Sequence, residues 1–181
     1  MSTIPPITNV YPSAPNPASF NLQLREMQAD AFFHLFKHAE EIATDEIAVI
    51  QQAGSGIASI EMDDCITLFA VEKTAIGAIS AIIGYHISSH TNVEAIQEMF
   101  DDEHDISPNL SYDIYLIGGN DASTAPGDLI DTIRSAIPII FIQNRIVGEY
   151  LNLKNSKENS YISAGMTMDG VFVFCEHDSL E

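Results

Sequence analysis

Apolar residues recur at two different spacings along the chain. Between residues 21 and 52 they recur every three or four positions, which predicts a helical segment that ends at Gly54-Ser55-Gly56. The apolar positions of this segment are Leu24, Met27, Ala31, Phe32, Leu35, Phe36, Ala39, Ile42 and Ala43. After residue 56 the apolar residues form short runs, and these runs predict strands.

Strands and helices are expected to alternate irregularly over the rest of the chain. The apolar runs predict strands over residues 57–60, 66–71, 76–88, 112–117 and 147–153. Helical spacing returns in residues 91–100 and 128–144, and Pro138 is expected to kink or divide the second of these helices.

The last two apolar runs, residues 161–167 and 171–175, predict a β-hairpin. They are joined by Met168-Asp169-Gly170, and an Asp-Gly pair permits the positive φ angles of a tight turn. Because β segments follow one another without regular βαβ alternation, the pattern predicts an α+β fold, with a layered β-sandwich or sheet flanked by helices.

The first twenty residues differ in composition from the rest. Residues 1–20 hold Pro5, Pro6, Pro12, Pro15 and Pro17, which predicts an extended, disordered tail. The remaining 161 residues, 21–181, have the length of one domain.

The net charge of −19 narrows the choice of partners. The chain has only seven Lys and Arg, so binding to the phosphates of nucleic acids is disfavoured. No apolar run is long enough to span a bilayer, so membrane insertion is not expected. An acidic surface favours a protein partner with a basic face, or simply keeps the protein in solution.

The numbers and spacing of cysteines and histidines indicate the cellular compartment and whether a metal site is expected. Two cysteines, Cys65 and Cys175, form no disulfide framework and are typical of a reducing compartment, which predicts a cytoplasmic protein. No basic, apolar leader is visible, and export by a route that reads no N-terminal signal stays open. His34 and His38 have the i,i+4 spacing of two ligands, but no third ligand is evident, so no metal site is predicted.

Cys65 and His86 are the main candidates for chemistry. Cys65 begins one predicted strand and His86 lies near the end of the next, so two adjacent strands can bring a thiol beside an imidazole. That pair is the minimum equipment of a nucleophilic cysteine. The competing interpretation is that Cys65 is a small buried apolar residue and His86 a hydrogen-bonded core histidine.

Three stretches of the chain resemble the chemoreceptor glutamine deamidase CheD and the catalytic domains of cytotoxic necrotizing factors. They are the strand opened by Cys65, the strand from Ile76-Gly77 to His86, and the strand over Tyr112–Gly119 that ends in Gly-Gly. The resemblance covers roughly residues 55–175. It implies a CheD-like α/β sandwich, a bacterial effector or toxin, and conversion of a protein glutamine to glutamate without a cofactor.

The resemblance also implies roles for individual residues. Cys65 is the nucleophile, His86 is the base, and Ser59 stands six residues before the cysteine, where CheD has the threonine that orients the imidazole. The chain departs from the family at Asp63-Asp64, where the family has small residues, and two carboxylates beside a thiol raise its pKa. The interval of 21 residues from Cys65 to His86 is also longer than in the family, but an even-numbered extension keeps the strand face, so His86 can still point at Cys65. His90 is the alternative base if the strand register is shifted.

Two other functions stay open beside the deamidase. In one, the protein is a non-enzymatic acidic interaction module, a secreted effector included, with Cys65 and His86 inert. In the other, the same pair serves a cysteine hydrolase or protease that cleaves a different bond.

Overall fold

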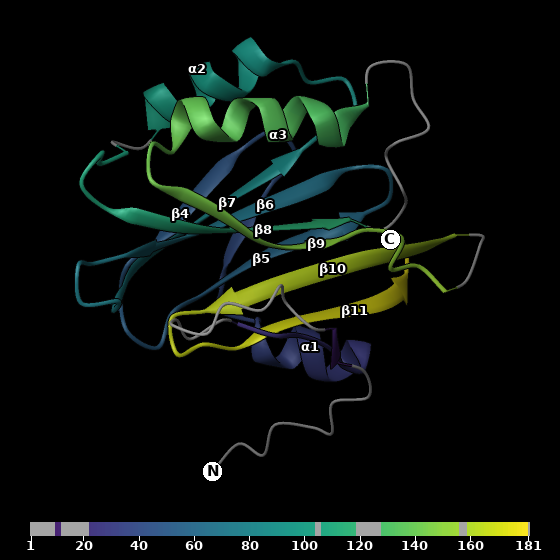
Figure 1. The fold of residues 1–181 in the computed structure, drawn as a ribbon. Helices are drawn as coiled ribbons and strands as arrows, with labels where there is room; N and C mark the ends of the chain where they lie inside the picture. Colours follow the sequence, from purple (N-terminus) through teal and green to yellow (C-terminus); the bar gives the residue numbers. More distant parts are fainter. Residues whose placement is uncertain (1–9, 12–21, 104–105, 119–127, 156–158, 181) are drawn as a thin grey trace.

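A computed structural model of the chain has four layers, with two mixed sheets packed face to face between helices (Figure 1). The structure describes residues 10–11, 22–103, 106–118, 128–155 and 159–180. In Figure 1, α2 and α3 cover the outer face of one sheet, and α1 lies below the other. The predicted α+β class and layered arrangement are therefore confirmed.

The first sheet has the strand order β1-β2-β11-β10-β5-β3. Its central strands pair antiparallel, while β2 and β3 join the sheet as parallel strands. The strands are β1 (Val10–Tyr11), β2 (Leu24–Glu26), β3 (Glu40–Ile42), β5 (Gly56–Met62), β10 (Ser160–Thr167) and β11 (Phe172–Asp178).

The second sheet has the order β4-β7-β6-β8-β9. All of its strand pairs are antiparallel except β8 with β9. The strands are β4 (Ile47–Ile50), β6 (Ile66–Lys73), β7 (Ile79–Ile87), β8 (Ser111–Gly118) and β9 (Asn144–Tyr150).

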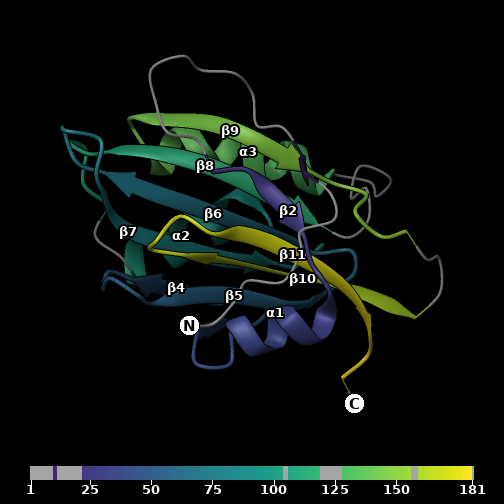
Figure 2. The same cartoon turned by 90° about the horizontal axis from the view of Figure 1, so that it is seen from below.

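Three helices lie in the described part of the chain: α1 (Ala29–Leu35), α2 (Val93–Glu103) and α3 (Leu129–Ile140). Successive side chains of a strand point to opposite faces, so one face of the second sheet packs on α2 and α3 and the other packs on the first sheet. Figure 2, seen from below, shows α1 against the outer face of the first sheet, where it covers Val173 and Cys175. Among the described residues, no helix has the length and apolarity needed to cross a membrane.

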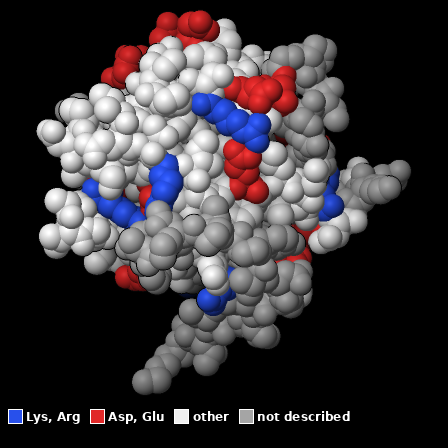
Figure 3. All heavy atoms as spheres, in the orientation of Figure 1, with Lys and Arg blue, Asp and Glu red and all other residues white. Residues whose placement is uncertain are grey.

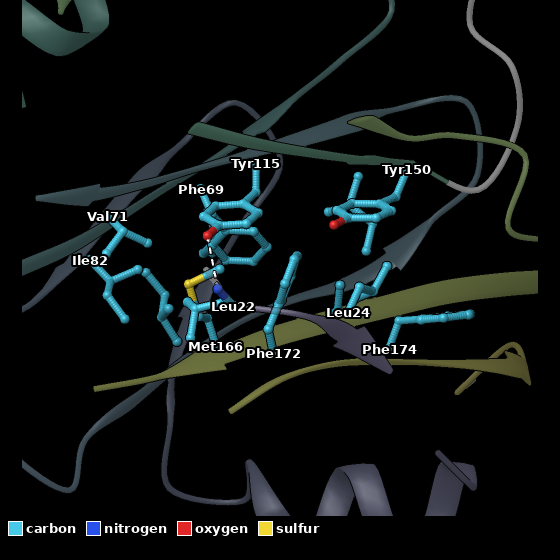
Figure 4. Packing of buried hydrophobic residues seen from close by; sticks show 14 of the residues in the cluster. Leu22, Leu24, Phe69, Val71, Ile82, Tyr115, Tyr150, Met166, Phe172 and Phe174 are labelled. Carbon is cyan, nitrogen blue, oxygen red and sulfur yellow. Dashed lines mark hydrogen bonds between the residues drawn. The ribbon is translucent and has the colours of Figure 1, made fainter. Parts of the chain in front are cut away.

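Aromatic rings fill the space between the sheets (Figure 4). Phe172 makes edge contacts with Phe69, Tyr115 and Tyr150. The buried hydroxyl of Tyr115 accepts a hydrogen bond of 3.1 Å from the backbone N–H of Leu22, which ties the segment before β2 to the second sheet. The polar site described below lies in the same layer, at one end of this apolar core.

The predicted helical segment over residues 21–52 is wrong for most of its length. The helix covers only Ala29–Leu35, and β2, β3 and β4 occupy the rest. The residues that share a helical spacing are divided between different cores: Leu24 and Ile42 face the second sheet, whereas Phe32 and Phe36 pack beneath the first. Contacts made across the fold thus override the local spacing.

The later elements agree better with the sequence. The strands and the final hairpin are confirmed, and Gly170 has the positive φ of 91° that the turn requires. Pro138 does not divide its helix, because it lies in the last turn of α3. The Pro-rich tail falls outside the described residues except Val10–Tyr11, which pair with β2.

Candidate functional site

His86 is held between two neighbouring strands near the end of β7. It pairs with Thr67 on β6, and its carbonyl accepts a 2.7 Å hydrogen bond from the backbone N–H of Asp45. Only 2% of the residue is exposed. Its neighbours Tyr85 and Ile87 face the helices, so alternation turns the imidazole toward the first sheet.

A chain of hydroxyl groups reaches the imidazole from both sheets. The Ser59 Oγ on β5 lies 3.0 Å from Nδ1 of His86, and the Thr67 Oγ1 lies 2.6 Å from the same Ser59 oxygen. All three residues are buried. The structure therefore joins two of the predicted site residues, Ser59 and His86, and adds Thr67.

A β-bulge shapes the strand that carries Ser59. The register between β5 and β10 shifts after Ser59, and Glu61 has a φ of 55°, in the left-handed region. The extra residue brings Met62 back to the inner face, where its Sδ lies 3.0 Å from the Thr67 hydroxyl. Strain of this kind is often found beside functional groups.

The second ring nitrogen of His86, Nε2, differs from Nδ1 in its contacts. Nε2 is buried and makes no hydrogen bond of good geometry with the described residues. Burial lowers the pKa of His86, although a backbone group of Ile42 and the Asp45 carboxylate act in the opposite direction. Thr67 donates to Ser59, so the Ser59 hydroxyl can donate to Nδ1, which puts the ring proton on Nε2. Only the other tautomer, in which Nδ1 carries the proton and donates a hydrogen bond to Ser59, leaves Nε2 able to accept a proton.

Cys65 lies directly before β6, close to the end of β8. Its carbonyl oxygen approaches Gly118 so closely that a Cβ there would stand 3.0 Å away. Side-chain contact with His86 is not made: among the described residues, the polar partner of the Cys65 Sγ is Asp64 Oδ1, at 3.8 Å. Cys65 precedes by two residues the Thr67 that pairs with His86, but the described residues show no hydrogen bond between the thiol and the imidazole.

Carboxylates surround the thiol. Burial raises the pKa of Cys65 to about 12, with further contributions from Asp64, Asp45 and Asp63. Lys154 forms a 2.7 Å ion pair with Asp63. The predicted rise in the thiol pKa is confirmed, with desolvation as the larger cause.

The other residues singled out in the sequence lie apart from this site or outside the described part. His90 is exposed in the turn after β7. Gly118 ends β8 beside Cys65, whereas Gly119 lies outside the described residues. Cys175 is fully buried beneath α1. The described residues contain no group of three potential metal ligands.

A second serine–histidine pair lies in the first sheet and was not predicted from the sequence. Ser163 on β10 and His177 on β11 lie on the outer face of the first sheet, with 2.7 Å between Oγ and Nε2. The Nδ1 of His177 lies 2.6 Å from the carbonyl of Asp178, and the ring packs against Phe33. The predicted hairpin contained the signal, because its register places His177 on the same face as Cys175.

Comparison with known protein families finds no matching family model, and a search of curated proteins finds no match.

Proposed function

We propose that the protein is a cysteine-dependent amide hydrolase that converts a glutamine side chain of a partner protein to glutamate. The observation that carries the proposal is the 3.0 Å hydrogen bond between Ser59 Oγ and His86 Nδ1. It is the contact expected of a residue that orients a catalytic base. Because Ser59 engages Nδ1, Nε2 is the nitrogen that would have to act on the thiol, in the tautomer in which Nδ1 carries the ring proton.

Cys65 and His86 carry out the proposed reaction, and Ser59 orients His86. The reaction requires the Cys65 thiol to come within reach of His86, where Nε2 accepts the thiol proton as sulfur attacks the amide carbon of glutamine. The C–N bond breaks, the imidazolium returns the proton, and ammonia leaves. Water, deprotonated by the same nitrogen, cleaves the thioester, which gives glutamate and the free thiol. No oxidant, reductant or cofactor is consumed.

The raised pKa of the thiol constrains this mechanism. At neutral pH Cys65 is protonated, so the imidazole has to remove the proton during the attack rather than before it. His86 is therefore essential in this mechanism, as in the serine–histidine pairs of hydrolases.

The charges around Cys65 indicate the kind of substrate. Asp45, Asp63 and Asp64 all raise the pKa of the thiol, and Lys154 is paired with Asp63. Figure 3 shows basic side chains beside acidic ones on one face of the molecule. Arg134 likewise forms ion pairs with Asp131 and Glu149. A substrate with a basic face would offset the carboxylates and lower the pKa of the thiol.

The test is deamidation of basic, glutamine-containing proteins. Histones and a lysine-rich peptide that contains glutamine would be incubated with the wild type, and ammonia release and the glutamine-to-glutamate mass change would be measured. Activity should vanish in Cys65→Ala and His86→Gln, fall in Ser59→Ala, and persist in the matched control Ser163→Ala. Activity that survives His86→Gln would refute the mechanism.

A non-enzymatic interaction module is the second candidate. It is favoured by the near-complete burial of His86, and by the desolvation and nearby carboxylates that raise the pKa of Cys65. In this case a basic partner would bind equally well to the wild type and to Cys65→Ala, and no protein glutamine would be converted.

A further inference from the structure

Strand β5 carries one extra residue just after Ser59. Two residues of β5, Ile60 and Glu61, lie opposite Ser163 alone on β10. In a regular strand, Ile60 and Met62 would point to the same face. Ile60 instead packs beneath the first sheet and Met62 packs between the sheets, so the bulge decides which side chains reach the inner layer.

The bulge places two side chains of β5 in the network that holds His86. Ser59 Oγ lies 3.0 Å from Nδ1 of His86, and Met62 Sδ lies 3.0 Å from the Thr67 hydroxyl. Thr67 also donates to Ser59, at 2.6 Å. A shift of one residue along a strand reverses the face of every side chain. Ser59 and Met62 therefore point into the same layer only while the bulge is kept.

Glu61 has a backbone conformation that needs support. Its φ of 55° lies in the left-handed region, which a residue other than glycine adopts at a cost. Its backbone N–H has no place in a regular ladder and donates instead to the Ser163 hydroxyl, at 3.0 Å. The conformation of Glu61 thus depends on contacts made outside the strand pairing.

The Glu61 carboxylate binds the two residues that follow β11. Its Oε1 accepts a hydrogen bond of 2.7 Å from the backbone N–H of Leu180 and one of 3.4 Å from the hydroxyl of Ser179. Because β10 lies between β11 and β5 in the sheet, residues 179–180 reach past β10 to make these contacts. Hydrogen bonds to an ionised acceptor are stronger than those between neutral groups, so this strap of residues 179–180 offsets the cost of the left-handed residue. Leu180 is 57% exposed, so the strap lies at the surface.

We propose that Glu61 is a positioning residue for Ser59 and that the strap of residues 179–180 holds it in place. The strap fixes the bulge, the bulge fixes the directions of Ser59 and Met62, and Ser59 fixes the imidazole of His86. A surface segment is in this way connected to a buried ring. The importance of Ser59 for catalysis rests on the proposed function, but its placement by Glu61 does not.

The test is the nitrogen chemical shifts of the His86 imidazole, measured by NMR on the full chain. Leu180→Pro removes the N–H that binds the carboxylate, and Leu180→Ala is the matched control that keeps it. Leu180→Pro should move the His86 ring signals toward those of Ser59→Ala, in which the contact at Nδ1 is absent. Leu180→Ala should leave them as in the wild type. Ring signals that are the same in Leu180→Pro and Leu180→Ala would overturn the proposal.

Variants of Glu61 separate the role of the carboxylate from a general loss of stability. Glu61→Ala should move the ring signals in the same direction, and Glu61→Gln, whose amide oxygen still accepts the Leu180 N–H, should restore them. Ser163→Ala leaves the carboxylate contacts in place and should move the signals less than Glu61→Ala does. Ring signals that Glu61→Ala leaves unchanged would contradict the role of the carboxylate.

Hydrogen exchange of backbone amides gives a second readout. In Leu180→Pro, exchange at Glu61 should accelerate by about three- to tenfold, the value of one hydrogen bond, while exchange at Phe69 in the middle of β6 stays unchanged. Equal acceleration at both amides would indicate a general loss of stability and contradict the strap. A protein that shows the expected changes but converts no glutamine would refute only the proposed function.

Discussion

The molecule contains two serine–histidine pairs, each near a cysteine. Ser59 and His86 meet between the sheets, beside the strand that follows Cys65. Ser163 and His177 meet on the outer face of the first sheet, where Ser163 is the cross-strand partner of Cys175. By residue type and contact distance alone, both pairs resemble part of a catalytic triad.

The two histidines differ in the hydrogen bonds that their imidazole rings make. Both ring nitrogens of His177 have hydrogen-bond partners: Nε2 has Ser163, and Nδ1 has the carbonyl of Asp178. His86 has Ser59 at Nδ1, whereas its buried Nε2 makes no hydrogen bond of good geometry with the described residues, although a backbone group of Ile42 acts on the imidazole. A catalytic base needs one nitrogen oriented and the other open. A serine–histidine contact is therefore not sufficient to identify a base, and the state of the second nitrogen has to be known.

The largest contrast is expected in stability. His86→Ala removes a buried ring between two sheets and should lower the free energy of unfolding by about 2–4 kcal/mol. His177→Ala removes a partly exposed ring and should cost about 1 kcal/mol or less. Urea denaturation of both variants gives the comparison, and equal costs would contradict the different burial of the two histidines.

The next effect concerns thiol reactivity. A pKa raised from 9.0 to about 12 means about a thousandfold less thiolate at neutral pH. Since a more basic thiolate is also a better nucleophile, Cys65 should react with iodoacetamide tens of times more slowly than a free cysteine. Asp64→Asn should accelerate the reaction by about three- to tenfold, because it removes the nearest carboxylate. Cys175→Ala is the background for both measurements. A wild type that reacts as fast as free cysteine would show that the thiol is already activated.

A smaller effect is expected from the serines. Ser59→Ala removes a buried hydroxyl that contacts both Thr67 and His86, and should cost about 1–2 kcal/mol. Ser163→Ala should cost about 0.5–1 kcal/mol, because its pair is only partly buried. The same denaturation assay measures both, and a larger loss in Ser163→Ala would reverse the comparison.

The smallest effect is expected from pH. The pKa of His86 is lowered by burial, so the folded state holds the neutral ring more strongly than the unfolded chain does. This contribution to stability is complete above the unfolded value of about 6.5, and is lost as pH falls below it. From pH 7.5 to 5.5, the wild type should lose more stability than His86→Gln. Ile42 and Asp45 oppose the shift and limit the size of the loss.

Part of this site could be predicted from the sequence. Ser59 and His86 were both identified, and period-two alternation along β7 explains why His86 points between the sheets. Thr67 was not predicted as a site residue, because it lies within an apolar run. Side chains alternate between the two faces of β6, so Thr67 shares the inward direction of Phe69. The Ile42 contact with the imidazole could not be predicted, because helical spacing assigned its segment to a helix. The bulge at Glu61 also has no local signal, since it arises from pairing with a strand a hundred residues away.

The most direct test of His86 as the base for Cys65 is the rate of Cys65 alkylation by iodoacetamide at pH 8. It would be measured in the Cys175→Ala background, with His86→Gln and the matched control His177→Gln. If Nε2 removes the thiol proton, His86→Gln should slow the reaction by at least about tenfold. General-base catalysis typically contributes about a hundredfold or more, so this threshold is a low one. His177→Gln should leave the rate unchanged. A rate that is the same in all three proteins would contradict a catalytic pair and leave Ser59 and His86 as part of the core.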